Sequence, residues 1–308
     1  MMINRRIAIV VPFWNLSETR YKALQICWAN LENLKKSFDK SKFDSELDIF
    51  NFNLSSTKEN EANGLRIDST IDLVVDKVST SFDKSIRINE MIMYIKNLGY
   101  DFVMMMDSDI LIDRNSYSKL FKIFNTSNVN ELYKFNMVRT SEKIYKEFDK
   151  NGLFLHDSYK DSKDICLCLN SENKKTRYIT GIDGDIFFNI DRFIKAGGYN
   201  ENFKVWGFED CEFVKRFKSD IDNKVRNSMI TIAHLWHVTH TSTAPVEENE
   251  YAKLQVRYFR NVEKFMKKNK GSKIIYSAFN SDIVPTIEFK HSISNSRYKI
   301  SSYLSLNI

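Results

Sequence analysis

Residues 100–112 have the sequence YDFVMMMDSDILI, and this stretch decides the fold class that we expect. Its first seven residues are nearly all apolar, which is typical of a strand buried on both faces of a parallel sheet. Apolar residues at helical spacing predict a helix from about residue 84 to 98, ended by Gly99. The side chains expected to point inward from this helix are Ile88, Met91, Ile92, Ile95 and Leu98.

Strand-like and helix-like segments alternate before this point. Residues 6–11 form a β-branched apolar run, and residues 47–52 and 71–78 are two further expected strands. Ser17 can cap a helix whose apolar residues fall on one face. Strand, helix and strand in repetition predict an α/β fold with a mostly parallel central sheet and helices on both faces.

Asp107, Ser108 and Asp109 directly follow the apolar run. Ligands of such sheets collect beyond the carboxyl ends of the strands, so both carboxylates should lie at the ligand-binding edge. Hard oxygen ligands suit Mn²⁺ or Mg²⁺ bridging a diphosphate, and an imidazole among the ligands favours Mn²⁺. Since the chain also contains Asp183-Gly184-Asp185, the position after a buried strand is what supports the metal-site interpretation.

Residues 181–217 hold five of the nine glycines and the cluster Trp206-Gly207-Phe208-Glu209-Asp210. Two adjacent carboxylates after an aromatic residue and a glycine suit an acid or base beside a sugar ring. Helical geometry would point Glu209 and Asp210 about 100° apart, so they can serve different tasks. The structural alternative is acidic charge at a helix amino terminus. Residues 181–185 are expected to line the site, whereas Gly197 and Gly198 suit a turn as well as a ligand contact.

Three of the five histidines, His234, His237 and His240, lie in or just after the strand-like stretch 229–237. Strict alternation would point His234 and His237 to opposite faces of a strand. Both can bind one metal only if the strand ends or kinks between them, and we favour His237. The alternative is that these histidines are packed in the core.

The chain's 308 residues suffice for one large domain or two intimately packed ones. Much of its formal charge of +6 lies in residues 246–308, where 11 Lys and Arg face 6 Asp and Glu. Residues 247–270 form an amphipathic helical pattern with a basic face. This face is either a solvated surface or a contact with anionic lipid or glycan. We expect no nucleic-acid binding, no signal peptide and no membrane-spanning helix.

The segments IAIVVPFWN (7–15), FDK (82–84), MMMDSDILI (104–112) and GGYNENFKVWGFEDCEFVKRF (197–217) together carry a family resemblance. They resemble glycosyltransferases of the GT-A fold, in particular the β1,4-galactosyltransferases and the N-acetylgalactosaminyltransferase-like domains of bacterial chondroitin-type and capsule polymerases. The similarity spans about residues 5–245 and leaves out the basic tail. It implies a nucleotide-sugar half (1–130) and an acceptor and catalytic half (131–245), and the amphipathic pattern predicts a helical extension over 246–308.

The resemblance also implies roles for individual residues. On the donor side, Pro12 and Phe13 begin the loop beneath the uracil, Phe82 and Lys84 meet the uridine and phosphate, Asp107 faces the ribose or metal, and Ser108 faces the nucleoside. Asp109 and His237 match metal ligands, and His234 takes a place that methionine holds in the galactosyltransferases. Trp206 would flank donor and acceptor, Glu209 would hold sugar hydroxyls, and Asp210 matches the general base. Gly181 belongs to the stretch expected to line the site.

The resulting hypothesis is an inverting, Mn²⁺-dependent transferase that moves a hexose or N-acetylhexosamine from a UDP-sugar to a glycan or lipid-linked acceptor. Four cysteines without paired metal-binding spacing favour reduced thiols and a cytoplasmic enzyme, with its basic tail peripheral to the inner face of the membrane. The alternatives are a retaining transferase of the same fold and a carbohydrate-binding protein without activity.

Overall fold

The computed structural model describes residues 5–13, 18–41, 43–53, 70–72, 84–140, 178–179, 183–201, 203, 208–235, 260, 264, 286–288 and 297–299. Its helices are α1 (Glu18–Asp39), α2 (Lys84–Asn97), the 3-10 helix η2 (Arg114–Ser116), α3 (Tyr117–Thr126), α6 (Ile190–Lys195) and α7 (Glu209–Ser219). Its strands are β1 (Arg5–Phe13), β2 (Ser45–Asn53), β3 (Thr70–Asp72), β4 (Phe102–Met105), β5 (Ile110–Ile112), β6 (Glu131–Arg139), β7 (Tyr178–Ile179), β8 (Ile186–Asn189), β9 (Lys224–His234), β10 (Thr286–Glu288) and β11 (Arg297–Lys299).

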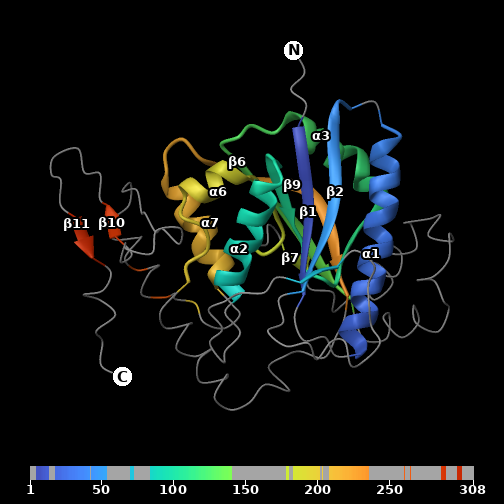
Figure 1. Ribbon diagram of the computed structural model, residues 1–308, viewed down its shortest axis with the longest axis horizontal. Coiled ribbons are helices and arrows are strands. Elements are labelled where there is room, and N and C mark those ends of the chain that lie inside the picture. Colours follow the sequence, from blue (N-terminus) through green and yellow to red (C-terminus); the bar gives the residue numbers. More distant parts are fainter. Residues whose placement is uncertain are drawn as a thin grey trace.

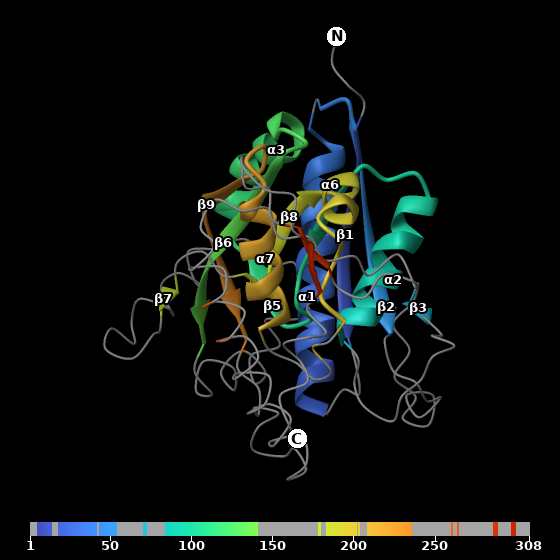
Figure 2. The same cartoon turned by 90° about the vertical axis from the view of Figure 1, so that its left-hand side faces the viewer.

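A central sheet organises the described residues, with strand order β3-β2-β1-β4-β8-β6-β9-β5 and β7 beside β6. Strands β3, β2, β1 and β4 are mutually parallel, whereas β8 runs antiparallel between β4 and β6. Strand β9 is parallel to β6, and β5 is antiparallel to β9. Figure 2 shows β2 and β3 at one side of the molecule and β6 and β9 at the other. This mixed α/β arrangement is compatible with the Rossmann-like fold that the sequence predicts.

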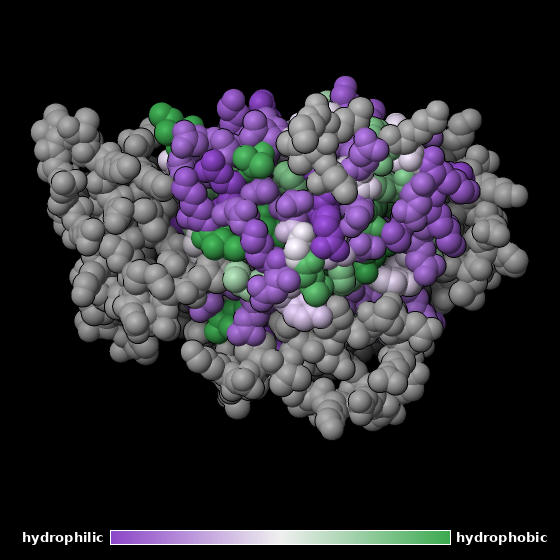
Figure 3. All heavy atoms as spheres, turned by 45° about the horizontal axis from the view of Figure 1, so that its top comes forward, coloured by the Kyte–Doolittle hydropathy of each residue, from purple (hydrophilic) through white to green (hydrophobic). Residues whose placement is uncertain are grey.

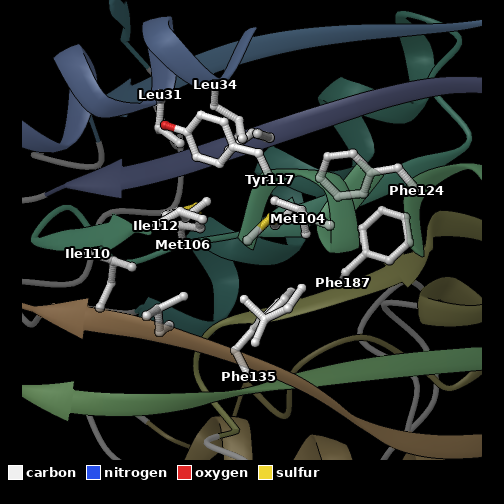
Figure 4. Packing of buried hydrophobic residues seen from close by; sticks show 14 of the residues in the cluster. Leu31, Leu34, Met104, Met106, Ile110, Ile112, Tyr117, Phe124, Phe135 and Phe187 are labelled. Carbon is white, nitrogen blue, oxygen red and sulfur yellow. The ribbon is translucent and has the colours of Figure 1, made fainter. Parts of the chain in front are cut away.

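Helices cover both faces of the sheet, as the sequence predicts (Figure 1). Strand β1 shows why its apolar run is continuous: Ile7, Ile9 and Val11 enter the core cluster of one face, and Ala8 and Val10 that of the other. Helices α1 and α3 pack on the first face, and α2, α6 and α7 on the second. Figure 4 shows the first cluster, where side chains of α1 and α3 meet those of β4, β5, β6 and β8.

Helix α2 confirms the predicted 84–98 segment, with one correction. Ile88, Met91, Ile92 and Ile95 are fully buried, but Leu98 is 41% exposed, so the prediction that it points inward is wrong. The helix ends at Asn97 and the chain turns at Gly99, which has φ +84°. Leu98 therefore lies in the turn and no longer on the helix face. The strand expected at 71–78 is described only as β3, and its remainder lies outside the described residues.

Most of the predicted helical extension 246–308 lies outside the described residues. Arg260 and Lys264 are helical and exposed, whereas β10 and β11 pair as a two-stranded antiparallel sheet. The described part of this region therefore contains strand as well as helix. No described helix has the length and apolar character needed to cross a bilayer. The described part of the face in Figure 3 is mostly hydrophilic, with small and scattered hydrophobic areas.

Candidate active site

Strand direction brings distant segments to one edge of the sheet. Asp107 follows the carboxyl end of β4, and Asp185 precedes the amino end of β8, which runs antiparallel to β4. These two residues therefore lie at the same edge. His234 ends β9, whose direction matches that of β4, so the same edge receives it as well. The sequence predicts the ligand site at this same edge, because ligands of such sheets bind beyond the carboxyl ends of the parallel strands.

Asp107, Ser108 and Asp109 form a tight turn between β4 and β5. Met106 N–H still donates to Val10 O at 3.0 Å, and Ile110 N–H donates back to Asp107 O at 3.3 Å. Asp109 is buried at 7% exposure, while Asp107 and Ser108 are half-buried. The turn thus presents one carboxylate toward the site and places the other deeper.

Asp109 lies against the end of β9. Its carbonyl oxygen accepts from Leu235 N–H at 2.8 Å, and its Oδ1 lies 3.5 Å from His234 Nε2. The pairing of Ile110 with His234 between β5 and β9 explains this proximity. Asp109 and His234, two of the three predicted metal ligands, are therefore neighbours. The third, His237, lies outside the described residues, among which no group of three or more His, Cys, Asp or Glu side chains is arranged to hold a metal ion.

Gly184 lies close to the carboxylates of both Asp107 and Asp210. A Cβ added at this glycine would be 3.3 Å from Asp210 Oδ2 and 3.9 Å from Asp107 Oδ2. The aspartate that closes the central strand and the predicted general base therefore border the same small space. This juxtaposition comes from three separate segments of the chain.

Asp210 is in the first turn of α7, and its Oδ1 accepts from Cys211 N–H at 2.7 Å. Burial and the neighbouring charge of Glu209 raise the pKa of Asp210 to about 7, although Lys84 and the hydrogen bond from Cys211 oppose the shift. A carboxyl group that titrates near neutral pH suits proton transfer.

Lys84, the first residue of α2, forms an ion pair with Glu209, with 2.7 Å between Nζ and Oε1. The Glu209 side chain is 1% exposed and that of Lys84 is 21% exposed. Desolvation lowers the pKa of Lys84, but the nearby carboxylates of Glu209, Asp107 and Asp210 outweigh it and raise that pKa overall. Lys84 is therefore a fixed cation beside the carboxylates of the site.

The backbone before α7 is strained. Phe208, the N-cap residue, has φ +71°, a left-handed conformation that costs a non-glycine residue about 1–2 kcal/mol. Strain of this kind is often held at functional sites.

Gly197 and Gly198 also have positive φ and end α6, which confirms the turn interpretation for them. Tyr199 follows this turn, and the side chain of Asn89 bonds both its N–H and its C=O, at 2.7 and 2.9 Å.

The sequence predicts that residues 181–185 line the site but indicates no individual role for Asp185. Asp185 is 1% exposed, and its Oδ1 accepts from Asp107 N–H at 2.9 Å. Burial and the charge of Asp107 raise the pKa of Asp185 well above the usual carboxyl value. Asp183 forms an ion pair with Lys134. The signal that could have revealed Asp185 is the second Asp-x-Asp pattern at 183–185.

Pro12 and Phe13, the last residues of β1, are half-buried and end at the same edge of the sheet as Asp107. The other predicted site residues, Phe82, Gly181, Trp206 and His237, lie outside the described residues.

Comparison with known proteins gives one family match. Residues 167–241 match a family model described as the N-terminal domain of galactosyltransferase. The matched range includes Asp185, Glu209, Asp210, and His234, together with β8, α7 and β9. No curated protein matches the chain. The family match supports a galactosyltransferase-like glycosyltransferase domain in this chain.

Proposed function

We propose that this protein is an inverting glycosyltransferase that moves a hexose or N-acetylhexosamine from a UDP-sugar to a hydroxyl of a glycan or glycolipid. The observation that carries the proposal is that the carboxylates of Asp107 and Asp210 both lie close to Gly184 and interact with Lys84. The galactosyltransferase match over residues 167–241 supports the same class of reaction.

Asp210 is the proposed general base. An acceptor hydroxyl is a poor nucleophile at neutral pH, so the base must remove its proton during attack on the anomeric carbon. Its pKa of about 7 leaves a large fraction of Asp210 unprotonated at pH 7.5 while keeping it basic enough to take the proton. Attack from the side opposite the leaving diphosphate inverts the anomeric configuration.

The leaving diphosphate develops negative charge as the glycosidic bond breaks. The Lys84 ammonium interacts with the charges of Asp107 and Asp210, and it can stabilise the charge of the leaving diphosphate. Glu209 Oε1 lies 2.7 Å from Lys84 Nζ. We propose that Glu209 positions Lys84 and that it also holds hydroxyl groups of the donor sugar, as the family resemblance of the chain implies.

Mn²⁺ is the proposed cofactor, with Asp109 and one or both of His234 and His237 as its ligands. The described residues fit such an ion because a buried carboxylate oxygen of Asp109 and an imidazole nitrogen of His234 lie 3.5 Å apart. Oxygen and imidazole donors together suit Mn²⁺. A bound divalent cation would supply further charge neutralisation at the diphosphate.

The acceptor is proposed from class and charge. A surplus of basic residues in the tail, with Arg260 and Lys264 exposed, suits an anionic membrane surface where a lipid-linked saccharide would be presented. We propose a cytoplasmic location and a role in surface-glycan synthesis on the same grounds.

Release of UDP from a panel of UDP-sugars, with and without Mn²⁺, tests the proposal. We expect turnover of at least one UDP-hexose or UDP-N-acetylhexosamine, abolished in Asp109→Ala and retained in Asp113→Ala. Asp113 is a suitable control because it follows β5, at the opposite end of that strand from Asp109, where its side chain accepts from Asn115 N–H at the start of η2. Binding of a UDP-sugar without turnover on any acceptor would instead indicate a carbohydrate-binding protein. Nuclear magnetic resonance of the product then distinguishes inversion from retention.

A further inference from the structure

Asp185 is a buried carboxylate next to an otherwise apolar strand. It is 1% exposed, and the three residues after it, Ile186, Phe187 and Phe188, are fully buried and hydrophobic. Burying a carboxylate costs free energy unless it is hydrogen-bonded. Core packing alone would therefore favour an apolar residue at this position, and the reason for an aspartate must be a specific contact.

That contact is with the backbone of Asp107. The pairing of β1 with β4 ends at Val10 and Met105, and Met106 N–H still donates to Val10 O. The next N–H, that of Asp107, donates to Asp185 Oδ1 at 2.9 Å. A carboxyl oxygen accepts a hydrogen bond from a backbone N–H whether or not the group is ionised.

The same turn is held at two further points. Ile110 N–H closes it by donating to Asp107 O at 3.3 Å, and Leu235 N–H donates to Asp109 O at 2.8 Å. His234, one residue before Leu235, lies beside the Asp109 carboxylate. The position of the Asp107 backbone is thus linked through the turn to the spacing between Asp109 and His234.

We propose that Asp185 is a positioning residue whose hydrogen bond to Asp107 N–H holds the turn 107–109 with Asp109 beside His234. The role in metal binding rests on the proposed function, whereas the role in holding the turn does not. In this role Asp185 acts through the backbone of Asp107.

The variants separate the hydrogen bond from the charge. Asp185→Asn keeps an oxygen acceptor without the charge. Asp185→Val removes the acceptor and keeps a side chain of similar volume. If Asp185→Val does not fold, Asp185→Ala is used in its place. Asp101→Ala is the matched control, because Asp101 Oδ2 also accepts from a backbone N–H, that of Arg6 in β1 at 3.0 Å, but at the opposite end of β4.

Two measurements are made on the full chain with UDP present: amide hydrogen exchange of Asp107 and Leu235, and Mn²⁺ binding by electron paramagnetic resonance. In Asp185→Val we expect both amides to exchange at least tenfold faster and Mn²⁺ to bind about 10–100-fold more weakly, as for loss of other groups that orient metal ligands. In Asp185→Asn and Asp101→Ala, the amide exchange rates and the Mn²⁺ affinity should both stay within about threefold of the wild-type values.

Unchanged exchange in Asp185→Val would overturn the proposal, as would an effect of Asp185→Asn as large as that of Asp185→Val. Failure of both apolar variants to fold, while Asp185→Asn folds, would also overturn it, because the bond would then support the fold and not the turn alone. A wild-type protein that binds no Mn²⁺ would refute the metal dependence of the proposed function, and the exchange rates would still decide the role of Asp185.

Discussion

Replacing Lys84 with methionine removes the cation that neutralises Glu209. The Glu209 side chain is 1% exposed, and its Oε1 lies 2.7 Å from Lys84 Nζ. Removing one partner of a buried ion pair costs about 3–5 kcal/mol, because the remaining charge has neither water nor a counter-charge. The adjacent carboxylate of Asp210 adds repulsion, so we expect the free energy of unfolding of Lys84→Met to fall by about 4 kcal/mol.

The reverse change, Glu209→Gln, should cost less. Lys84 is 21% exposed and keeps the charges of Asp107 and Asp210 nearby. We expect a loss of about 1.5–3 kcal/mol, the usual cost of a lost hydrogen bond to a charged group. The control is Lys96→Met, on the same helix: Lys96 Nζ also lies 2.7 Å from a carboxylate, that of Asp191, but the side chains are 36% and 70% exposed. Such an exposed pair contributes less than about 1 kcal/mol.

Urea unfolding followed by circular dichroism measures all three variants, with the midpoint and slope compared separately. The reasoning is refuted if Lys84→Met is no less stable than Lys96→Met. It is also refuted if Glu209→Gln loses as much stability as Lys84→Met, because the difference in exposure would then carry no energetic weight.

Asp210→Asn should lower turnover about 10²–10⁴-fold while donor binding is retained. Wild-type kcat/KM should rise with pH through about 7, because the base must lose its proton, and Glu209→Gln should move this rise to lower pH since Glu209 raises the pKa of Asp210; a flat profile from pH 6 to 8 would contradict this. Gly99→Ala should cost about 1–2 kcal/mol in urea unfolding, because φ is +84° and the added Cβ would lie 3.0 Å from Arg6 Nη1; an unchanged midpoint would count against it. Arg216→Met should cost about 3–5 kcal/mol by stranding the buried Glu212, which Arg216 Nε meets at 2.8 Å. Adding Glu212→Leu should recover the part of that loss due to the stranded carboxylate but not the part due to the carbonyls of Ala196 and Gly198, to which Arg216 also donates; a double variant no more stable than the single one would contradict this.

Local patterns were enough to predict the elements that surround the site. The apolar runs of β1 and β4 and the helical spacing of α2 depend on burial of adjacent residues, which the sequence displays directly. The rule that ligands lie beyond the carboxyl ends of strands then placed Asp107 at the ligand-binding edge.

What the sequence left undetermined depends on contacts between distant segments. Nothing local shows that β8 inserts antiparallel between β4 and β6, yet this order is what brings Asp185 to Asp107. The pairing of Lys84 with Glu209 likewise needs α2 and α7 to be neighbours on one face. The sequence favoured His237 over His234 as a ligand; the structure describes only His234, beside Asp109, so the preference for His237 stays a prediction.

The two hydrogen bonds between the Asn89 side chain and Tyr199 have a consequence for protein engineering. They attach α2 to the segment that leads into α7, and Lys84 attaches the start of α2 to Glu209. Residues 183–217 therefore cannot be exchanged as an independent cassette, even though they hold the candidate base. A chimera that grafts this segment from a transferase of different sugar preference would have to bring the inward side chains of α2 with it.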